Sequence, residues 1–82
     1  MNKIDINIAI SGPTNSGKSH ITYLIMQMLE EKGFDCNLTD NDFVDTEDFK
    51  NKMSKDLDKI INVITNKTSI KITNTYIKRN NI

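Results

Sequence analysis

The 82-residue chain is poor in several residue types that support common functions. Cysteine occurs once, at Cys36, which excludes an intramolecular disulfide and a cysteine-based metal site. Histidine also occurs once, at His20, without a ligand partner at metal-binding spacing. The only arginine, Arg79, stands in the last four residues. A single thiol fits a reducing compartment, so we expect a cytoplasmic protein.

The chain also lacks net charge, because 11 basic residues balance 11 acidic ones. Nonspecific binding to nucleic acid needs a net basic face, so no nucleic-acid partner is expected. No stretch approaches the ~18 apolar residues of a membrane span. The first ten residues, MNKIDINIAI, carry Asp5 inside their apolar run and lack the apolar core of a signal peptide. We therefore expect no membrane partner.

The length leaves room for one domain, residues 1–82. A chain of this size buries only ~60–65% of the surface that its unfolded form exposes, so its stability should be modest. Association with a second copy would add buried surface, which makes a homodimer the simplest expectation.

Apolar periodicity predicts alternating strands and helices. Apolar residues alternate with polar ones over residues 4–10, 34–38 and 70–77, which predicts three strands. Spacings of three and four predict a helix from Gly17 to just before Gly33 and a long amphipathic helix over residues 47–66. The order β-α-β-α-β predicts an α/β fold with two helices and a three-stranded, mostly parallel sheet.

Residues 12–19 read GPTNSGKS and match the phosphate-loop pattern G-x-x-x-x-G-K-[ST]. A random chain of this length would match it well under ~1% of the time, given average glycine usage. Gly12 permits a tight turn out of the first predicted strand. The N–H groups of the following residues can converge on an anion, aided by the positive end of the helix that follows. The motif therefore predicts a phosphate site.

Each position in the motif has a predicted role. Lys18 would reach the β- and γ-phosphates of ATP or GTP, and the Ser19 hydroxyl would complete the coordination of Mg²⁺. His20, directly after the motif, would face solvent or touch a bound base. The predicted nucleotide-binding residues are Gly12, Asn15, Ser16, Gly17, Lys18, Ser19 and His20. Two alternatives stay open: a glycine-rich turn that only joins strand to helix, and a vestigial loop without nucleotide.

The stretch from Ile6 to Phe43, INIAISGPTNSGKSHITYLIMQMLEEKGFDCNLTDNDF, resembles the P-loop NTPases, and among them the kinase-like branch. It covers slightly under half of the chain. The resemblance implies a minimal P-loop fold. In such kinases an acidic residue just after the second strand often faces the phosphate acceptor, so Asp40 and Asp42 join Lys18 as candidate catalytic residues. The alternative is a solvated acidic loop that caps the next helix at Asp45 or Thr46.

The chain departs from this family in two places. The family's second motif is a hydrophobic strand that ends in an Asp, which orients Mg²⁺ through water. Here the corresponding stretch reads SIKITNTY, and Asn74 or Thr75 stands where that Asp is expected. No arginine-bearing lid is visible either, although positioning and charge neutralisation supply most of the catalysis in phosphoryl transfer.

Three functions follow as hypotheses. The first is a nucleotide-binding protein with little or no turnover and a regulatory or accessory role; small P-loop proteins of this kind look similar to open reading frames of phage genomes. The second is a minimal kinase or NTPase completed by oligomerisation. The third is a protein-interaction module whose loop no longer binds nucleotide.

Overall fold

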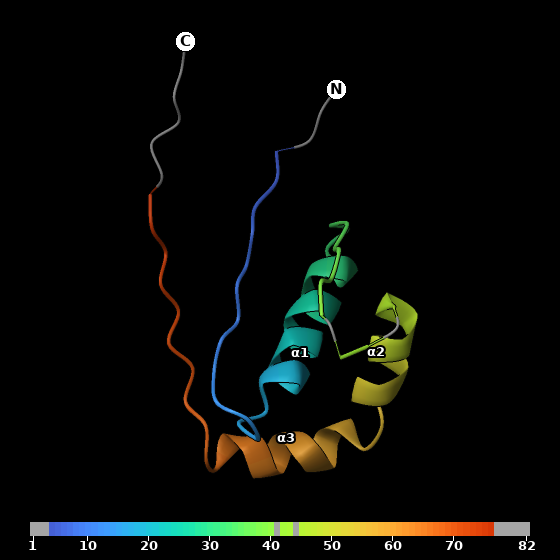
Figure 1. Cartoon of the computed structure of the whole chain (residues 1–82), viewed down its shortest axis with the longest axis vertical. Coiled ribbons are helices and arrows are strands. Elements are labelled where there is room, and N and C mark those ends of the chain that lie inside the picture. The colour runs from blue at the N-terminus through green and yellow to red at the C-terminus, as the bar shows by residue number, and fades with distance from the viewer. Residues whose placement is uncertain (1–3, 41, 44, 77–82) are drawn as a thin grey trace.

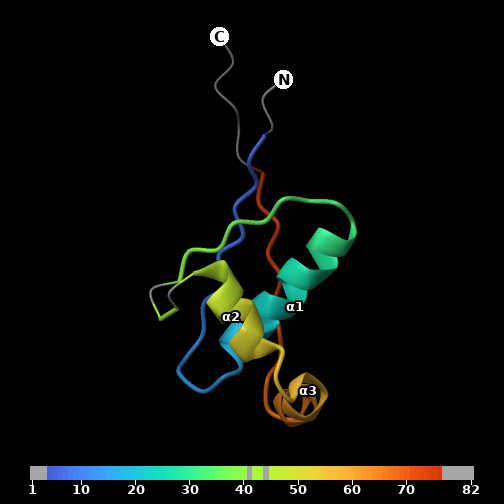
Figure 2. The same ribbon diagram turned by 90° about the vertical axis from the view of Figure 1, so that its right-hand side faces the viewer.

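All regular structure in the described part of the chain is helical (Figure 1). The protein is represented by a computed structural model that describes residues 4–40, 42–43 and 45–76. Its helices are α1 (Lys18–Glu31), α2 (Thr46–Met53) and α3 (Leu57–Thr65). Helices α1 and α2 lie side by side, and α3 crosses below their lower ends (Figures 1 and 2).

The predicted three-stranded sheet is wrong. Residues 4–10 and 70–76 run extended and roughly alongside each other (Figures 1 and 2), but no strand is formed within the described residues. Ile77, the last residue of the third predicted strand, lies outside those residues. The α/β fold class, and with it the implied minimal P-loop fold, is therefore corrected to an arrangement of helices with extended flanking segments.

The sheet does not form because these segments bury little of their apolar surface against the helices. A short sheet is stable only when one of its faces is buried against other elements. Here the alternating residues face solvent: Ile6 is 85% exposed and Ile72 is 87% exposed. The helices pack against one another instead. Alternation of apolar and polar residues predicts an extended chain. Whether two extended segments pair as strands depends on distant parts of the chain, which the local pattern does not specify.

Helix α1 is encoded locally, and its prediction is confirmed to within two residues. Gly17, in the left-handed region with a φ of 90°, precedes its first residue. At the other end Gly33 has a φ of 97°, and its N–H donates to the Glu30 carbonyl. The N–H of Phe34 donates to the Leu29 carbonyl, which completes a Schellman motif. The left-handed conformation of Gly33 therefore ends α1 at Glu31.

The predicted long helix over residues 47–66 is wrong, because it breaks into α2 and α3. Asp56 has a φ of 50°, a left-handed conformation that interrupts helical hydrogen bonding. Aspartate tolerates this conformation better than most residues. The break redirects the chain, so that Phe49 of α2 and Ile64 of α3 both become buried on differently oriented helices.

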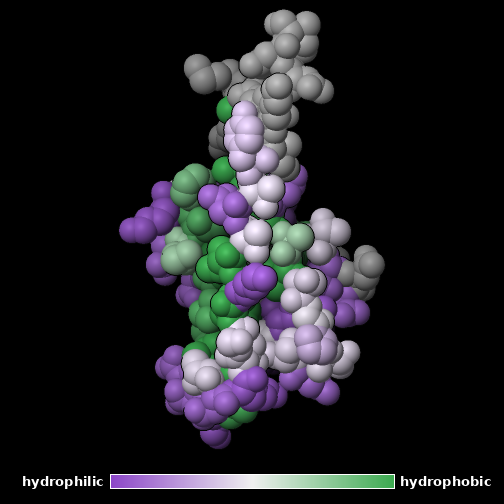
Figure 3. All heavy atoms as spheres, turned by 90° about the vertical axis from the view of Figure 1, so that its left-hand side faces the viewer, coloured by the Kyte–Doolittle hydropathy of each residue, from purple (hydrophilic) through white to green (hydrophobic). Residues whose placement is uncertain are grey.

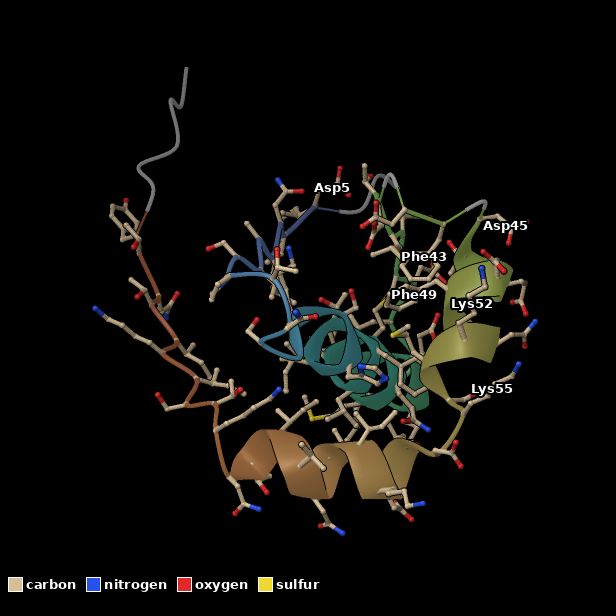
Figure 4. All side chains as sticks on the ribbon, turned by 60° about the horizontal axis from the view of Figure 1, so that its bottom comes forward. Asp5, Phe43, Asp45, Phe49, Lys52 and Lys55 are labelled. Atoms are coloured by element: carbon tan, nitrogen blue, oxygen red, sulfur yellow. The ribbon has the colours of Figure 1, made fainter. Side chains whose placement is uncertain are left out.

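The core is small, and Phe49 is its centre. Its side chain is fully buried, and Met26 and Ile64 are the other buried apolar residues among those described. The Phe43 ring meets Phe49 edge-on with 5.1 Å between centroids, and the Tyr23 centroid is 6.4 Å away. Figure 4 shows Phe43 and Phe49 close together beside α2. These rings join α2 to α1.

Polar contacts secure the start and the side of α2. The Asp45 carboxylate accepts from the N–H of Asp48 at 2.8 Å, which caps the helix, as one of the two predicted caps would. Lys50 pairs with Glu30 of α1 at 2.9 Å. The hydrogen bond to Glu30 raises the pKa of Lys50 above its ordinary value.

Candidate phosphate-binding loop

Residues 12–17 form the turn that connects the extended N-terminal segment to α1 (Figure 1). Asn15 has a φ of 66° and Gly17 a φ of 90°, whereas Ser16 between them is not in the positive-φ region. Alternating conformations of this kind bring successive backbone N–H groups to one side of the chain, where they form a concave anion nest. The local geometry is therefore suited to an anion.

The N–H groups of this loop are available. Within the described residues, no backbone carbonyl accepts a hydrogen bond from the N–H groups of residues 14–20. The first such bond near the start of α1 runs from the Ile21 N–H to the Gly17 carbonyl at 3.0 Å. Free N–H groups and the positive end of α1 thus coincide at the motif.

Lys18, Ser19, Asp40 and Asp42 line one depression of about 410 Å³. Apolar residues Ile8, Ile10 and Leu38, together with Thr22 and Thr39, complete its lining. The structure therefore brings together the predicted phosphate lysine, the predicted Mg²⁺ ligand and both candidate acidic residues. Lys18 and Asp42 are exposed, and Ser19 and Asp40 are half-buried, so a solute can reach all four.

The donor set of this depression suits Mg²⁺ held together with a nucleotide. A hydroxyl and two carboxylates supply hard oxygen ligands, and Mg²⁺ commonly combines one or two carboxylates with waters and substrate phosphates. Among the residues that the structure describes, no group of three or more His, Cys, Asp or Glu residues is arranged to hold a metal ion by itself. Phosphate oxygens would therefore have to complete the coordination.

The acidic loop also has a local structural role. One oxygen of Asp40 accepts the N–H of Asp42 at 2.9 Å and closes a small turn. Asp45 caps α2. The alternative interpretation of this loop as a solvated capping segment thus describes part of what its carboxylates do.

A second depression, of about 500 Å³, lies beside the loop against α3. His20, Asn15 and Gly17 line it with the apolar residues Ile60, Val63 and Ile64 and the lysines Lys59 and Lys67. His20 is thus separated from the depression that Lys18 and Ser19 line. Gly12 and Ser16 line neither depression; a Cβ on Gly12 would stand 3.2 Å from the Ser16 hydroxyl.

Two residues that hold the loop in place from the side of α3 could not be predicted from the sequence. The Lys67 ammonium donates to the Asn15 carbonyl at 3.1 Å, and the Thr68 hydroxyl donates to the Ser16 carbonyl at 2.7 Å. Both donors follow the end of α3 and stand 52 residues further along the chain. No local pattern marks them, because their role depends entirely on where α3 packs.

None of the described helices is both long and apolar enough to cross a membrane. Comparison of the chain with models of protein families, with curated proteins and with solved structures gave no match.

Proposed function

We propose that this chain binds the phosphates of Mg²⁺-ATP or Mg²⁺-GTP with residues 12–19 and acts as a regulatory or accessory protein with little or no turnover. One observation carries the proposal. The GPTNSGKS motif forms a loop with free N–H groups at the start of α1, and its Lys18 and Ser19 line a depression that solute can reach. A cytoplasmic setting belongs to the same proposal, since the lone Cys36 is a free thiol.

Different groups of the loop would bind the phosphates and the Mg²⁺ ion. The N–H groups of Ser16, Gly17 and Lys18 would donate to phosphate oxygens, and the Lys18 ammonium would neutralise their charge. The hydroxyl of Ser19 would take one position on Mg²⁺, with waters and phosphates taking others. Little turnover is expected, because the family's second acidic motif and its arginine lid have no counterpart in this sequence.

A second candidate function, a minimal kinase or NTPase completed by oligomerisation, is favoured by the position of Asp40 and Asp42. Both carboxylates line the same depression as Lys18 and Ser19, where a phosphate acceptor would have to bind. In this case Asp40→Asn and Asp42→Asn would abolish turnover. In a receptor without turnover, neither substitution would change a catalytic rate.

A third candidate, an interaction module, is favoured by the exposed apolar residues of the extended segments. Ile4, Ile6, Ile70, Ile72 and Tyr76 are all more than half exposed. In Figure 3 hydrophobic side chains gather on the face from which these segments are seen. We propose that a second copy of the chain covers them, and this homodimer is compatible with either nucleotide hypothesis.

Calorimetric titration of ATP and GTP, each with Mg²⁺, into the wild type and Lys18→Ala tests the proposed function. We expect micromolar binding by the wild type and a loss of more than about tenfold in the variant, since a charge-assisted contact to phosphate is removed. Lys55→Ala is the matched control, because Lys55 is exposed in the turn between α2 and α3 (Figure 4) and lines neither depression. If neither nucleotide binds at millimolar concentration, the nucleotide hypotheses are both wrong.

A further inference from the structure

We infer that Thr68, assisted by Lys67, is a positioning residue for the phosphate loop: it fixes the peptide planes that aim the Ser16 and Gly17 N–H groups at a bound phosphate. This inference rests on the proposed function and adds residues that the loop motif does not contain. The Thr68 hydroxyl donates to the Ser16 carbonyl at 2.7 Å, a short hydrogen bond that is partly buried.

The direction of the N–H groups follows from peptide geometry. The described peptide bonds are all trans, and in a trans peptide the carbonyl and the N–H of the same plane point in opposite directions. The Ser16 carbonyl points to Thr68, so the Gly17 N–H points away from it. The Asn15 carbonyl points to Lys67, so the Ser16 N–H points away from that side as well.

Two successive N–H groups are therefore turned to the same side of the loop, opposite the segment that follows α3. Neither has a backbone acceptor among the described residues. The side they leave is the one where Lys67 and Ile64 line the depression against α3. A phosphate bound by these two N–H groups would therefore lie on the side away from Lys67 and Thr68; Lys18 and Ser19, the next residues of the motif, line the other depression.

Thr68 and Lys67, which hold the loop, are themselves fixed in place by the packing and hydrogen bonds of Ile64. Ile64 is 5% exposed, and its side chain packs so closely on Gly17 that an added Cβ would be 2.7 Å from its Cδ1. The chain after α3 is held by bonds from the N–H groups of Lys67 and Thr68 to the Ile64 carbonyl. Thr68 is therefore fixed relative to the loop before any ligand arrives, which lowers the ordering cost of binding.

Substitution of Thr68 by Val tests the inference, because it removes the hydroxyl and nearly preserves the shape. We expect the Kd for Mg²⁺-ATP to rise about threefold to tenfold, the effect of one hydrogen bond. Thr65→Val is the matched control: its hydroxyl donates to the Asn62 carbonyl within α3 and does not touch the loop. Thr68→Ser keeps the hydroxyl and should keep the wild-type Kd.

Amide resonances provide a readout that general destabilisation would not mimic. On addition of Mg²⁺-ATP, the Ser16 and Gly17 amide protons of folded wild type should shift strongly, and those of Thr68→Val should shift less. If Thr68→Val does not fold, the pair Thr68→Ala and Thr68→Ser gives the same comparison.

Equal Kd values for Thr68→Val and Thr65→Val, in a protein whose wild type binds Mg²⁺-ATP, would overturn the positioning role and leave the proposed function intact. A wild type that binds no nucleotide would overturn the proposed function, and this inference with it.

Discussion

Gly17 stands where two separate constraints act on a single residue. Its φ of 90° lies in the left-handed region that a Cβ disfavours. In addition, a Cβ there would overlap two carbons of the buried Ile64 side chain, at 2.7 and 2.8 Å. The second glycine of the motif is therefore required by the packing of α3 as well as by any phosphate.

Alanine substitutions at Gly17 and Gly33 separate these two constraints. Both glycines have similar positive φ values, but a Cβ on Gly33 meets no atom within 4 Å. We expect Gly33→Ala to cost about 1–2 kcal/mol through backbone conformation alone. Gly17→Ala should cost at least about 1 kcal/mol more, because overpacking adds to it.

Chemical denaturation of the two variants measures this difference in free energy of unfolding. Equal losses would mean that Ile64 moves aside without cost, and would contradict the close packing of α3 on the loop.

Among the elements, the break between α2 and α3 is the feature that local periodicity concealed. The helical spacing of apolar residues is kept from Met53 to Leu57, on either side of residues 54–56, so the pattern favours one helix. However, one straight helix could not cover α1 with Phe49 and also place Ile64 against Gly17 at the end of α1. Packing therefore outweighs the helical propensity of this short stretch.

Asp56→Ala and Asp56→Gly distinguish a broken helix from a continuous one. In a continuous helix, alanine would be more stable than glycine by about 0.8–1 kcal/mol. In the left-handed conformation of Asp56 the order should invert, because alanine there costs about 1–2 kcal/mol and glycine does not.

Thermal unfolding of the two variants gives the order directly, with the wild type as the common reference. Greater stability of the alanine variant would show that residues 46–65 form one helix in solution.

At the scale of the whole molecule, the helical core is small and the extended segments are poorly covered. Only Met26, Phe49 and Ile64 are buried apolar residues in the described part of the chain. Extended backbone beside exposed β-branched residues readily pairs with another chain. A single copy therefore gains stability by covering these segments, as the proposed homodimer would.

Sedimentation velocity of Ile72→Lys tests the homodimer. We expect the wild type to sediment at twice the monomer mass and Ile72→Lys to sediment as a monomer, because a charge would be buried at the contact. Met28→Lys is the control, since Met28 is 56% exposed on α1 and does not belong to an extended segment. A wild type that stays monomeric at the highest concentration reached would contradict the association.

The sequence alone determined what depends on neighbouring residues. Its periodicity and Gly33 specified α1, the two candidate caps Asp45 and Thr46 indicated where α2 starts, and GPTNSGKS specified a loop at the beginning of α1. The motif also suggested Lys18 and Ser19, and the resemblance to kinases suggested Asp40 and Asp42; the structure places all four in one depression. The ends of α1, the start of α2 and the loop arise from local backbone preferences and short spacings, which any fold containing these segments would have to respect.

Only the tertiary structure decided the rest. The apolar spacing of α1 could not determine that Met26 is buried and Met28 is 56% exposed, because the packing of α2 and α3 decides which part of α1 is covered. Similarly, the alternation of apolar and polar residues over 4–10 and 70–76 could not determine whether these segments pair as strands. Pairing requires that one face of the sheet be buried, and the helices do not bury it. The brace from Thr68 to Ser16 joins residues 52 positions apart, so it exists only once α3 has packed against the loop.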